Sequence, residues 1–309
     1  MKSAYILTPV ISVLGVTAVY IVILYLSRAF YKKRKRDSPF TQDFLRAPGQ
    51  SSGEKIEYLN GKIGRHFALL IALPLLLSSF YLAHLYIYKT EFNPMLIQIV
   101  MLAGAGLSAY FLVKTLKLAK ERRMARQGYE GKIAVGRELD RLVLEGNHVY
   151  HDFPAEDSNI DHIVVGRSGI FAVATGARSK PAATNRTDDA TVEYNGKILM
   201  FPNGDDYKTV AQAERQASWI SEWISKAIGE QVAARAIVAL PGWFVKRTSA
   251  EGISVVNPQQ FPSLFKHINP RYLTDEMISD IVHQLDRKYR EVKPVCKTNH
   301  SQPSQTKKK

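Results

Sequence analysis

The sequence of 309 residues contains a single cysteine, Cys296, so no disulfide bond can form within the chain. This composition is compatible with a reducing compartment. Motifs of several functional classes are also missing. There is no glycine-rich phosphate loop and no cysteine–histidine spacing of a zinc site, and Ser168 has glycine on only one side of the nucleophile-elbow pattern. These absences argue against P-loop nucleotide hydrolysis, a structural zinc and a serine hydrolase.

Charged residues are also absent from three long stretches in the first part of the chain. Each stretch reaches the roughly 20 residues that a helix needs to cross the hydrocarbon core of a bilayer. We therefore expect three transmembrane helices, at about residues 5–27, 67–88 and 94–113. A signal peptide is the alternative for the first stretch, but its apolar run exceeds a typical h-region and no small-x-small cleavage pattern precedes Arg28.

Basic residues are concentrated beside these stretches. Residues 1–126 hold 18 Lys and Arg against 6 Asp and Glu, whereas residues 127–309 hold 24 against 22. The excess lies in the loop 31–65 and after the third predicted helix. By the positive-inside rule, the N-terminus lies outside, and the basic loop and everything after about residue 114 lie in the cytoplasm. The basic clusters could also attract anionic lipid head groups.

The predicted membrane anchor thus covers residues 1–126, in a multi-pass protein of a cell inner membrane or plasma membrane. Within it, residues 37–62 are rich in proline, glycine and serine and predict a flexible connector. The rest of the chain is close to neutral. The overall pI of about 9.7 is therefore poor evidence that this later part binds nucleic acid.

Periodicity and turn residues predict the elements of a domain at residues 127–293. Helical spacing is found at about 130–145, 209–228 and 274–287, and β-rich runs at 149–153, 160–165, 170–173, 192–194, 198–201, 234–240 and 253–256. Strands and helices alternating around a mixed sheet predict an α/β fold. The polar, lysine-ended tail at 294–309 is expected to be disordered.

Asp161 lies inside the apolar strand predicted at 160–165, with His162 beside it. A carboxylate in such a setting is costly unless a partner compensates its charge. Two interpretations are open at this point. Asp161 is either a metal ligand at the edge of a site, or a carboxylate that caps a turn or pairs with His162 or Arg167.

The run around Asp161 resembles the core of the NERD (nuclease-related) domain, a branch of the PD-(D/E)xK nuclease superfamily. In that family an Ile-Asp-His strand is followed, after a glycine turn, by a strand ending in Glu-Thr-Lys and by a Ser-Lys-Pro-like segment. Asp161 falls on the family aspartate, Thr175 on the threonine and residues 179–181 on the trailing segment. The resemblance covers roughly residues 127–290. It implies a restriction-endonuclease-like domain with a mixed sheet, carried by the membrane anchor on its cytoplasmic side.

Three motif positions depart from the family pattern. Ala174 stands where the family has glutamate, Gly176 where it has lysine, and Lys132 where the preceding helix has a further glutamate. The family chemistry implied is phosphodiester cleavage, which needs anionic ligands for Mg²⁺ and a group that positions water. Asp161 alone remains in place and would hold Mg²⁺ weakly. We therefore expect impaired catalysis and no cofactor, with Mg²⁺ required if nuclease activity remains.

Basic and amide side chains near the former active face are candidates for contacts to a phosphate backbone. They are Arg167, Arg178, Lys180, Arg186, Gln212 and Gln216. We expect a membrane-anchored protein that binds or processes DNA or RNA at the inner face of the membrane. The alternatives are an active or residual Mg²⁺-dependent nuclease, and a scaffold that binds other proteins of a membrane complex.

Overall fold

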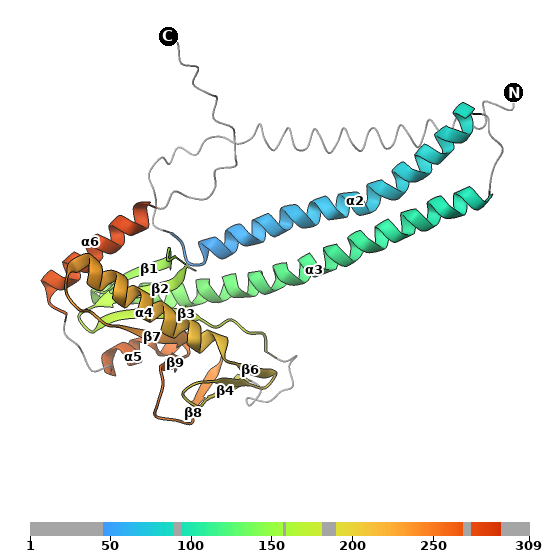
Figure 1. Ribbon diagram of the computed structural model, residues 1–309. Helices are drawn as coiled ribbons and strands as arrows, with labels where there is room; N and C mark the ends of the chain where they lie inside the picture. The colour runs from blue at the N-terminus through green and yellow to red at the C-terminus, as the bar shows by residue number, and fades with distance from the viewer. Residues whose placement is uncertain (1–45, 89–93, 157–158, 181–189, 268–272, 292–309) are drawn as a thin grey trace, which may run out of the picture. The chain divides into compact units, whose positions relative to one another are not determined.

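The computed structural model describes residues 46–88, 94–156, 159–180, 190–267 and 273–291 (Figure 1). The chain divides into two compact units. The first comprises Met1–Pro39 and Glu54–Ala125, and the second comprises Phe40–Gly53 and Arg126–Lys309. Three sequence predictions lie outside the described residues: the first transmembrane helix at 5–27, the phosphate contact of Arg186 and the disordered tail at 294–309.

Two long helices dominate the first unit. They are α2 (Gln50–Tyr88) and α3 (Pro94–Asp140), and both are long and apolar enough to cross a membrane. The predicted helices at 67–88 and 94–113 lie within them. Gly104 of α3 lies against Pro74 and Leu77 of α2, where an added Cβ would be 3.9 to 4.0 Å from these residues.

Helix α2 is longer than predicted, because it begins at Gln50 and includes residues expected to form a flexible connector. The prediction was wrong for residues 50–62. Pro48 and Gly49 end the irregular segment, and Gly49 has a φ of +70° that favours glycine. The residues from Glu54 onward include good helix formers and no proline before Pro74, so the helix continues without a break.

The second unit is built on a mixed five-stranded sheet in the order β1-β2-β3-β7-β9. Strands β1 to β3 pair antiparallel, whereas β3, β7 and β9 run parallel. Their bounds are β1 His148–Phe153, β2 Ile160–Gly166, β3 Gly169–Thr175, β7 Ala234–Ala239 and β9 Ser254–Val256. Because strands and helices alternate along the chain and the sheet is mixed, the domain is mixed α/β, as predicted.

A smaller four-stranded sheet has the order β6-β5-β4-β8. Its strands are β4 Thr191–Tyr194, β5 Leu199–Phe201, β6 Gly204–Asp206 and β8 Phe244–Arg247. The hairpin of β4 and β5 was predicted from Asn195-Gly196, and the asparagine side chain accepts hydrogen bonds from the amides of Lys197 and Ile198. Strands β6 and β8 were not predicted, because β6 consists of a glycine and two aspartates and β8 ends in Lys246 and Arg247, so neither forms an apolar β-rich run.

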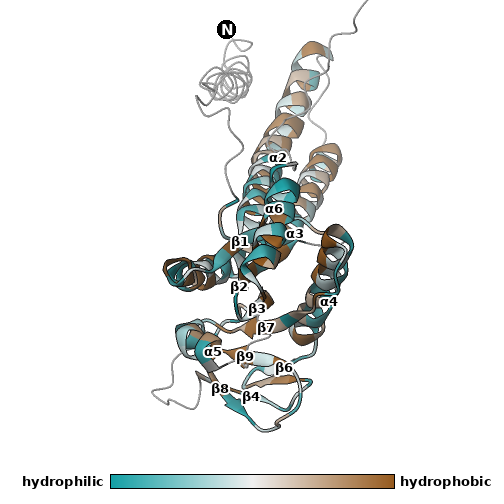
Figure 2. Ribbon diagram, turned by 90° about the vertical axis from the view of Figure 1, so that its left-hand side faces the viewer, coloured by the Kyte–Doolittle hydropathy of each residue, from teal (hydrophilic) through white to brown (hydrophobic). Residues whose placement is uncertain are grey.

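Helices cover both faces of the large sheet (Figures 1 and 2). On one face α4 (Lys208–Ile228) and α6 (Asp275–Glu291) bury apolar side chains against β2 and β3. On the other face lie the end of α3, the short helix η1 (Arg141–Glu145), and α5 (Phe261–His267) with η3 (Pro258–Gln260) before it. The helix predicted at 130–145 is therefore the end of α3 followed by η1, not a separate element.

Residues 46–53, here called the strap, belong to the second unit although they are distant from it in sequence. The Arg46 guanidinium lies 2.9 Å from a carboxylate oxygen of Asp152, which also accepts hydrogen bonds from the Ser51 amide and hydroxyl. Asp152 is fully buried and has a φ of +51°. Gly136 of α3 leaves room for Pro48, because a Cβ there would lie 2.6 Å from the proline ring.

Candidate functional site

Asp161, the second residue of β2, is 3% exposed and fully engaged by neighbouring groups. Its Oδ1 lies 2.8 Å from the Lys132 ammonium. Its Oδ2 accepts a 2.8 Å hydrogen bond from the amide of Thr175, the last residue of β3. The carboxylate therefore has the partner that its apolar setting demands, and that partner is Lys132 rather than His162 or Arg167.

Lys132 reaches Asp161 because α3 packs very closely against the end of β3. A Cβ on Gly131 would lie 2.6 Å from the Cβ of Ala177 and 3.3 Å from a methyl group of Thr175. No larger residue fits at position 131 without moving the helix away from the strand. The close contact allows the lysine side chain to end at the buried carboxylate.

The other two motif positions lie beside this ion pair, and both are closely packed. The antiparallel register pairs His162 with Val173, which places Ala174 next to Asp161 on the neighbouring strand. Ala174 is 1% exposed and packs in an apolar cluster with Leu240 and Trp243. A Cβ on Gly176 would lie 2.4 Å from a methyl group of the fully buried Leu240. A glutamate at 174 would meet apolar side chains, and a side chain at 176 would require the Leu240 methyl group to move.

A chain of polar groups leads from this site through two buried histidines to the exposed Asp140. Thr175 Oγ1 lies 3.2 Å from His162 Nε2, and His162 Nδ1 lies 2.8 Å from His151 Nδ1. His151 Nε2 lies 2.9 Å from a carboxylate oxygen of Asp140 at the end of α3. With both rings neutral, every contact is satisfied if the threonine donates to His162, His162 to His151, and His151 to Asp140. Burial, with His151 and Lys132 nearby, holds the pKa of His162 well below its ordinary value and favours this neutral form.

Sequence reasoning missed the histidine chain. The available signal was weak: His151 and His162 each lie beside an aspartate in an apolar run, which indicates buried polar groups but not their contacts. The antiparallel register of β1 and β2 places the two histidines opposite one another. That pairing is a tertiary feature that neither strand reveals alone.

A cavity of about 370 Å³ opens beside the ion pair. It is lined by Gly128, Lys132, Thr175, Gly176, Ala177, Arg178, Phe201, Asp206 and Thr209. The Arg178 guanidinium lies over the Phe201 ring at 4.6 Å and donates to the Asn203 carbonyl. Burial alone would raise the pKa of Asp206, but hydrogen bonds from Thr209 and the Lys208 amide, with Arg178 nearby, hold that pKa below its ordinary value. The cavity therefore contains fixed charges of both signs.

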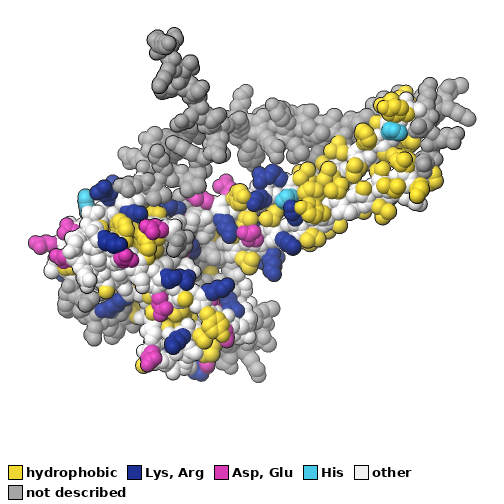
Figure 3. Space-filling model, in the orientation of Figure 1, with side chains coloured by type: hydrophobic (Ala, Val, Ile, Leu, Met, Phe, Trp, Pro, Cys, Tyr) yellow, Lys and Arg dark blue, Asp and Glu magenta, His cyan; other side chains and the backbone are white. Residues whose placement is uncertain are grey.

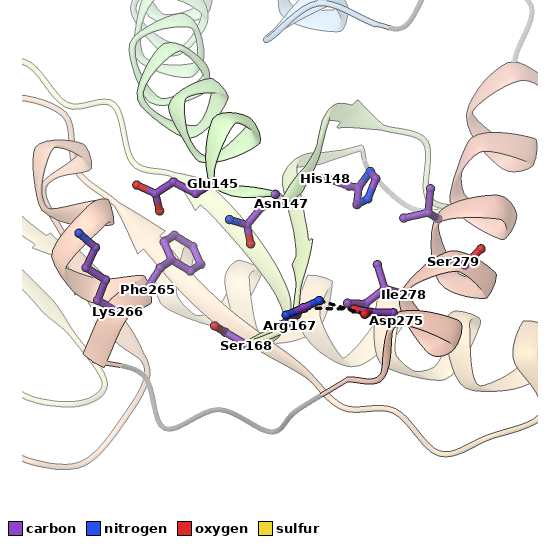
Figure 4. A pocket seen from close by; sticks show the side chains of 12 residues that line it. Glu145, Asn147, His148, Arg167, Ser168, Phe265, Lys266, Asp275, Ile278 and Ser279 are labelled. Atoms are coloured by element: carbon purple, nitrogen blue, oxygen red, sulfur yellow. Dashed lines mark hydrogen bonds and ion pairs between the residues drawn. The ribbon is translucent and has the colours of Figure 1, made fainter.

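The basic residues predicted to cluster near Asp161 are separated in the structure. Arg178 follows the end of β3 and lines this cavity. Lys180 is exposed two residues further on, and the end of its side chain lies near Gly242. Arg167 lies in the turn after β2, six residues from Asp161 along an extended strand, which corresponds to about 20 Å. It pairs with Asp275 through contacts of 3.1 and 2.9 Å and lines a different cavity, of about 790 Å³ (Figure 4). The predicted cluster is therefore wrong for Arg167, because the length of β2 separates the two ends of the sheet.

The two glutamines of α4 differ in exposure. Gln212 is partly exposed, whereas Gln216 is 5% exposed and its side-chain nitrogen donates to the Asn159 carbonyl at the start of β2. Gln216 thus stabilises the chain before Asp161 and does not face solvent. The tryptophans at 219 and 223 stack on each other and pack against the core of the sheet.

The donor set around Asp161 does not fit a Mg²⁺ ion. Mg²⁺ requires near-octahedral oxygen ligands and gives up its water reluctantly. Here one carboxylate faces an ammonium group, and its second oxygen is held by a backbone amide. Within the described part of the chain, no group of three or more histidine, cysteine, aspartate or glutamate side chains could hold a metal ion.

Comparison with known proteins gives a match to one family model. No curated protein and no solved structure matches the chain. The family model of the nuclease-related domain, NERD, matches residues 127–241, which include the end of α3, the first seven strands and α4. The matched region contains Lys132, Asp161, Ala174 and Gly176, so the motif positions identified from the sequence fall within it. Residues 127–241 are therefore a nuclease-related domain of the NERD family.

Proposed function

We propose that this protein is a multi-pass membrane protein whose NERD domain binds DNA or RNA at the cytoplasmic face of a cell inner membrane or plasma membrane without cleaving it. The observation that carries the proposal is the ion pair between Lys132 and Asp161, in which an ammonium group lies 2.8 Å from the carboxylate that the family resemblance implies as a metal ligand. A fixed positive charge there repels a divalent cation. It also compensates the aspartate, so the fold no longer requires a metal.

The packing of the other motif positions supports the loss of cleavage. Restoring a glutamate at Ala174 would place a carboxylate among apolar side chains, and a lysine at Gly176 would displace Leu240 from the core. The residues at positions 132, 174 and 176 thus each disfavour metal-dependent cleavage. Position 132 carries a repelling charge, position 174 has an apolar setting, and position 176 is in close contact with Leu240.

A cleavage assay tests this part of the proposal. The full chain, purified in detergent, is incubated with single-stranded and duplex DNA and RNA in Mg²⁺ or Mn²⁺. We expect no cleavage above that of the Asp161→Ala variant. Metal-dependent cleavage by the wild type that Asp161→Ala abolishes would overturn it and would favour the alternative of an active nuclease.

A metal-binding measurement tests the same point without relying on activity. Lys132→Glu places two carboxylates where the ion pair stands, so we expect Mn²⁺ to raise the Tm of that variant. Mn²⁺ should leave the Tm of the wild type unchanged. A Mn²⁺-dependent increase in the wild type that Asp161→Ala removes would show that the aspartate binds metal despite Lys132.

Nucleic-acid binding is supported by Arg178, which lines the cavity, and by the exposed Lys180 two residues further on, and it can be tested through its salt dependence. Each phosphate contact contributes about 0.9 to the slope of log affinity against log salt on duplex DNA. Arg178→Gln with Lys180→Gln should weaken binding of a labelled duplex and lower the slope by about 2. Arg167→Gln, at the other end of β2, is the control and should change neither the affinity for the duplex nor the salt slope. If no nucleic acid binds at low salt and other proteins copurify instead, the domain is a scaffold.

Membrane anchoring is supported by the length and apolar composition of α2 and α3 and by the uncharged run at 5–27. The Lys and Arg bias supports a cytoplasmic location for the C-terminal domain. The single cysteine, Cys296, provides a direct test. A membrane-impermeant maleimide should label it only after the cells are permeabilised. Labelling of intact cells would reverse the proposed orientation.

A further inference from the structure

The first unit shows a change of side-chain type along α2 and α3 (Figure 3). The part of α2 after His66 and the part of α3 before Lys114 contain no charged side chain among the described residues. At the end of this apolar part, Lys and Arg side chains gather on both helices. Beyond them, acidic residues appear as well, at Glu54, Glu57 and Glu121.

Three contacts fix how the two helices align. The ring of His66 lies 5.8 Å from that of Phe111, Gly104 packs against Pro74, and Lys55 pairs with Glu121 at 3.4 Å. These contacts follow one antiparallel register along the whole helix pair. The same register places Lys62 and Arg65 of α2 level with the first basic residues of α3, a relation that the sequence does not reveal.

The result is a basic band of five side chains along one short length of the helix pair. They are Lys62, Arg65, Lys114, Lys117 and Lys120. No acidic residue occurs at 58–65 of α2 or at 112–120 of α3. Among the described residues, none of the five forms an ion pair. Gly61 and Gly64, on either side of Lys62, have open space where a side chain would be. Arg65, Lys114, Lys117 and Lys120 are exposed and Lys62 is half-buried, so within the described residues the band presents cations without an ion-pair partner, and Glu57 and Glu121 mark its outer edge.

Aromatic rings accompany two of these lysines. The Lys62 ammonium lies 4.5 Å from the ring centre of Tyr58, and the Lys114 ammonium lies 4.7 Å from that of Tyr110. Both tyrosines are more than half exposed. Tyrosine and lysine side by side are typical of the layer where a bilayer meets water, because each has an apolar body and a polar end.

We propose that the basic band is a binding site for the phosphate groups of anionic phospholipids. This inference rests on the proposed membrane anchoring. The helix segments on the apolar side, 67–88 and 94–113, are about 30 Å long at 1.5 Å per residue, which matches the hydrocarbon core. On α3 the band runs from residue 114 to residue 120, a rise of about 9 Å at 1.5 Å per residue, which is similar to the thickness of one head-group layer.

Lipid fits this band better than nucleic acid does, because the band borders the apolar surface directly. A nucleic-acid backbone there would lie against exposed leucine and valine side chains such as Leu112 and Val113. A phospholipid satisfies both regions at once, with its phosphate at the cations and its acyl chains along the apolar helices. The charge pattern and the apolar pattern thus select the same partner.

Spin-label spectroscopy of the reconstituted full chain tests the inference. The protein is placed in phosphatidylcholine bilayers that contain a trace of spin-labelled phosphatidylglycerol or spin-labelled phosphatidylcholine, and the motionally restricted fraction gives a relative association constant. We expect a preference of about fivefold for phosphatidylglycerol, the effect of roughly one close cation. The preference should approach 1 in 1 M NaCl, where the Debye length is about 3 Å.

Two variants with equal loss of charge separate the band from overall charge. The first carries Gln at Lys62, Arg65, Lys114 and Lys117 and should lose the preference. The control carries Gln at Lys197, Lys208, Arg215 and Lys266, which are exposed in the second unit, and should keep it. An equal association constant for both lipids in the wild type, or an equal loss in both variants, overturns the inference.

Failure of the underlying anchoring gives a different result. Wild-type protein that is released from membranes by alkaline carbonate overturns the proposed anchoring, and this inference with it. Wild-type protein that is retained by the membrane but shows no lipid preference overturns the lipid site alone.

Discussion

Lys132 and Asp161 form a nearly buried pair, so removing one partner leaves the other charge uncompensated. Lys132→Met should lower the free energy of unfolding by about 3 kcal/mol, because Asp161 is then an isolated buried carboxylate. The double variant Lys132→Met with Asp161→Asn should recover much of this loss, since the asparagine can still accept the Thr175 hydrogen bond. Denaturant unfolding followed by tryptophan fluorescence measures the free energy of unfolding of both variants, because all three tryptophans lie in the second unit.

A double-mutant cycle gives the criterion for this prediction. Strict additivity of the two single changes would mean that the lysine and the aspartate do not interact, and would contradict the geometry. The need for a partner at Asp161 could be predicted from the apolar strand around it. The partner itself could not, because the approach of Lys132 depends on the packing of Gly131 against Ala177.

His162 makes stability depend on pH. Its pKa is lowered in the folded protein by burial, with His151 and Lys132 adding to the effect, whereas the unfolded chain titrates near 6.5. Below that pH the unfolded state binds a proton that the folded state does not. Stability contributed by the neutral ring is therefore present above pH 6.5 and is lost as the pH falls, by at most about 1.4 kcal/mol per pH unit.

The variant His162→Gln isolates this contribution, because an amide can replace the hydrogen bonds but does not titrate. Between pH 7 and 5, the free energy of unfolding should fall less steeply in the variant than in the wild type. His151, Asp140, Lys132 and Asp161 remain in both proteins, so the difference in slope reports on His162. Equal slopes would show that the folded state accepts the proton without cost.

At the scale of elements, the strap provides a test of how the second unit is held together. Arg46 is 12% exposed at its side chain and pairs with the fully buried Asp152, whereas Arg167 and Asp275 are each 74% exposed. Arg46→Met should therefore lower the free energy of unfolding by about 3 kcal/mol. Arg167→Met is the matched control and should cost less than about 1 kcal/mol. Similar losses in both variants would contradict a structural role for the strap.

The elements with a strong pattern were predictable from the sequence, and those without one were not. Helix α4 shows apolar residues at helical spacing and ends at Gly229, where φ is +78°, so its bounds were nearly correct. The start of α2 was missed because glycine and serine near Gln50 indicate a loop, although the helix continues through them. The role of the strap was missed for a different reason: a pair such as Arg46 and Asp152, 106 positions apart, leaves no local signal.

At the scale of the whole molecule, residues Glu54–Ala125 of the two long apolar helices interrupt the second unit in sequence, because the strap precedes them and the NERD domain follows them. The family match at 127–241 includes neither the strap nor α6. A fragment that begins at residue 127 therefore lacks Arg46 and Ser51 and leaves Asp152 buried without these partners. Such a fragment should be less stable than the intact protein by several kcal/mol.

Excision of the helix pair should instead give a stable soluble domain. The variant joins residue 53 to residue 126 through about six glycine and serine residues, which span up to roughly 20 Å, enough to connect two adjacent helices whose axes lie 8 to 10 Å apart. It keeps residues 40–53 and 126–291 and removes the apolar surface of the first unit. We expect a monomer that unfolds in one cooperative transition, measured by tryptophan fluorescence and calorimetry, at a higher temperature than the fragment 127–291.

The control is the same excision with Arg46→Met and Ser51→Ala, which should bring the Tm down toward that of the fragment because Asp152 loses its charged partner and two hydrogen bonds. Equal Tm values for the excised protein and the fragment would show that the strap is not part of the domain.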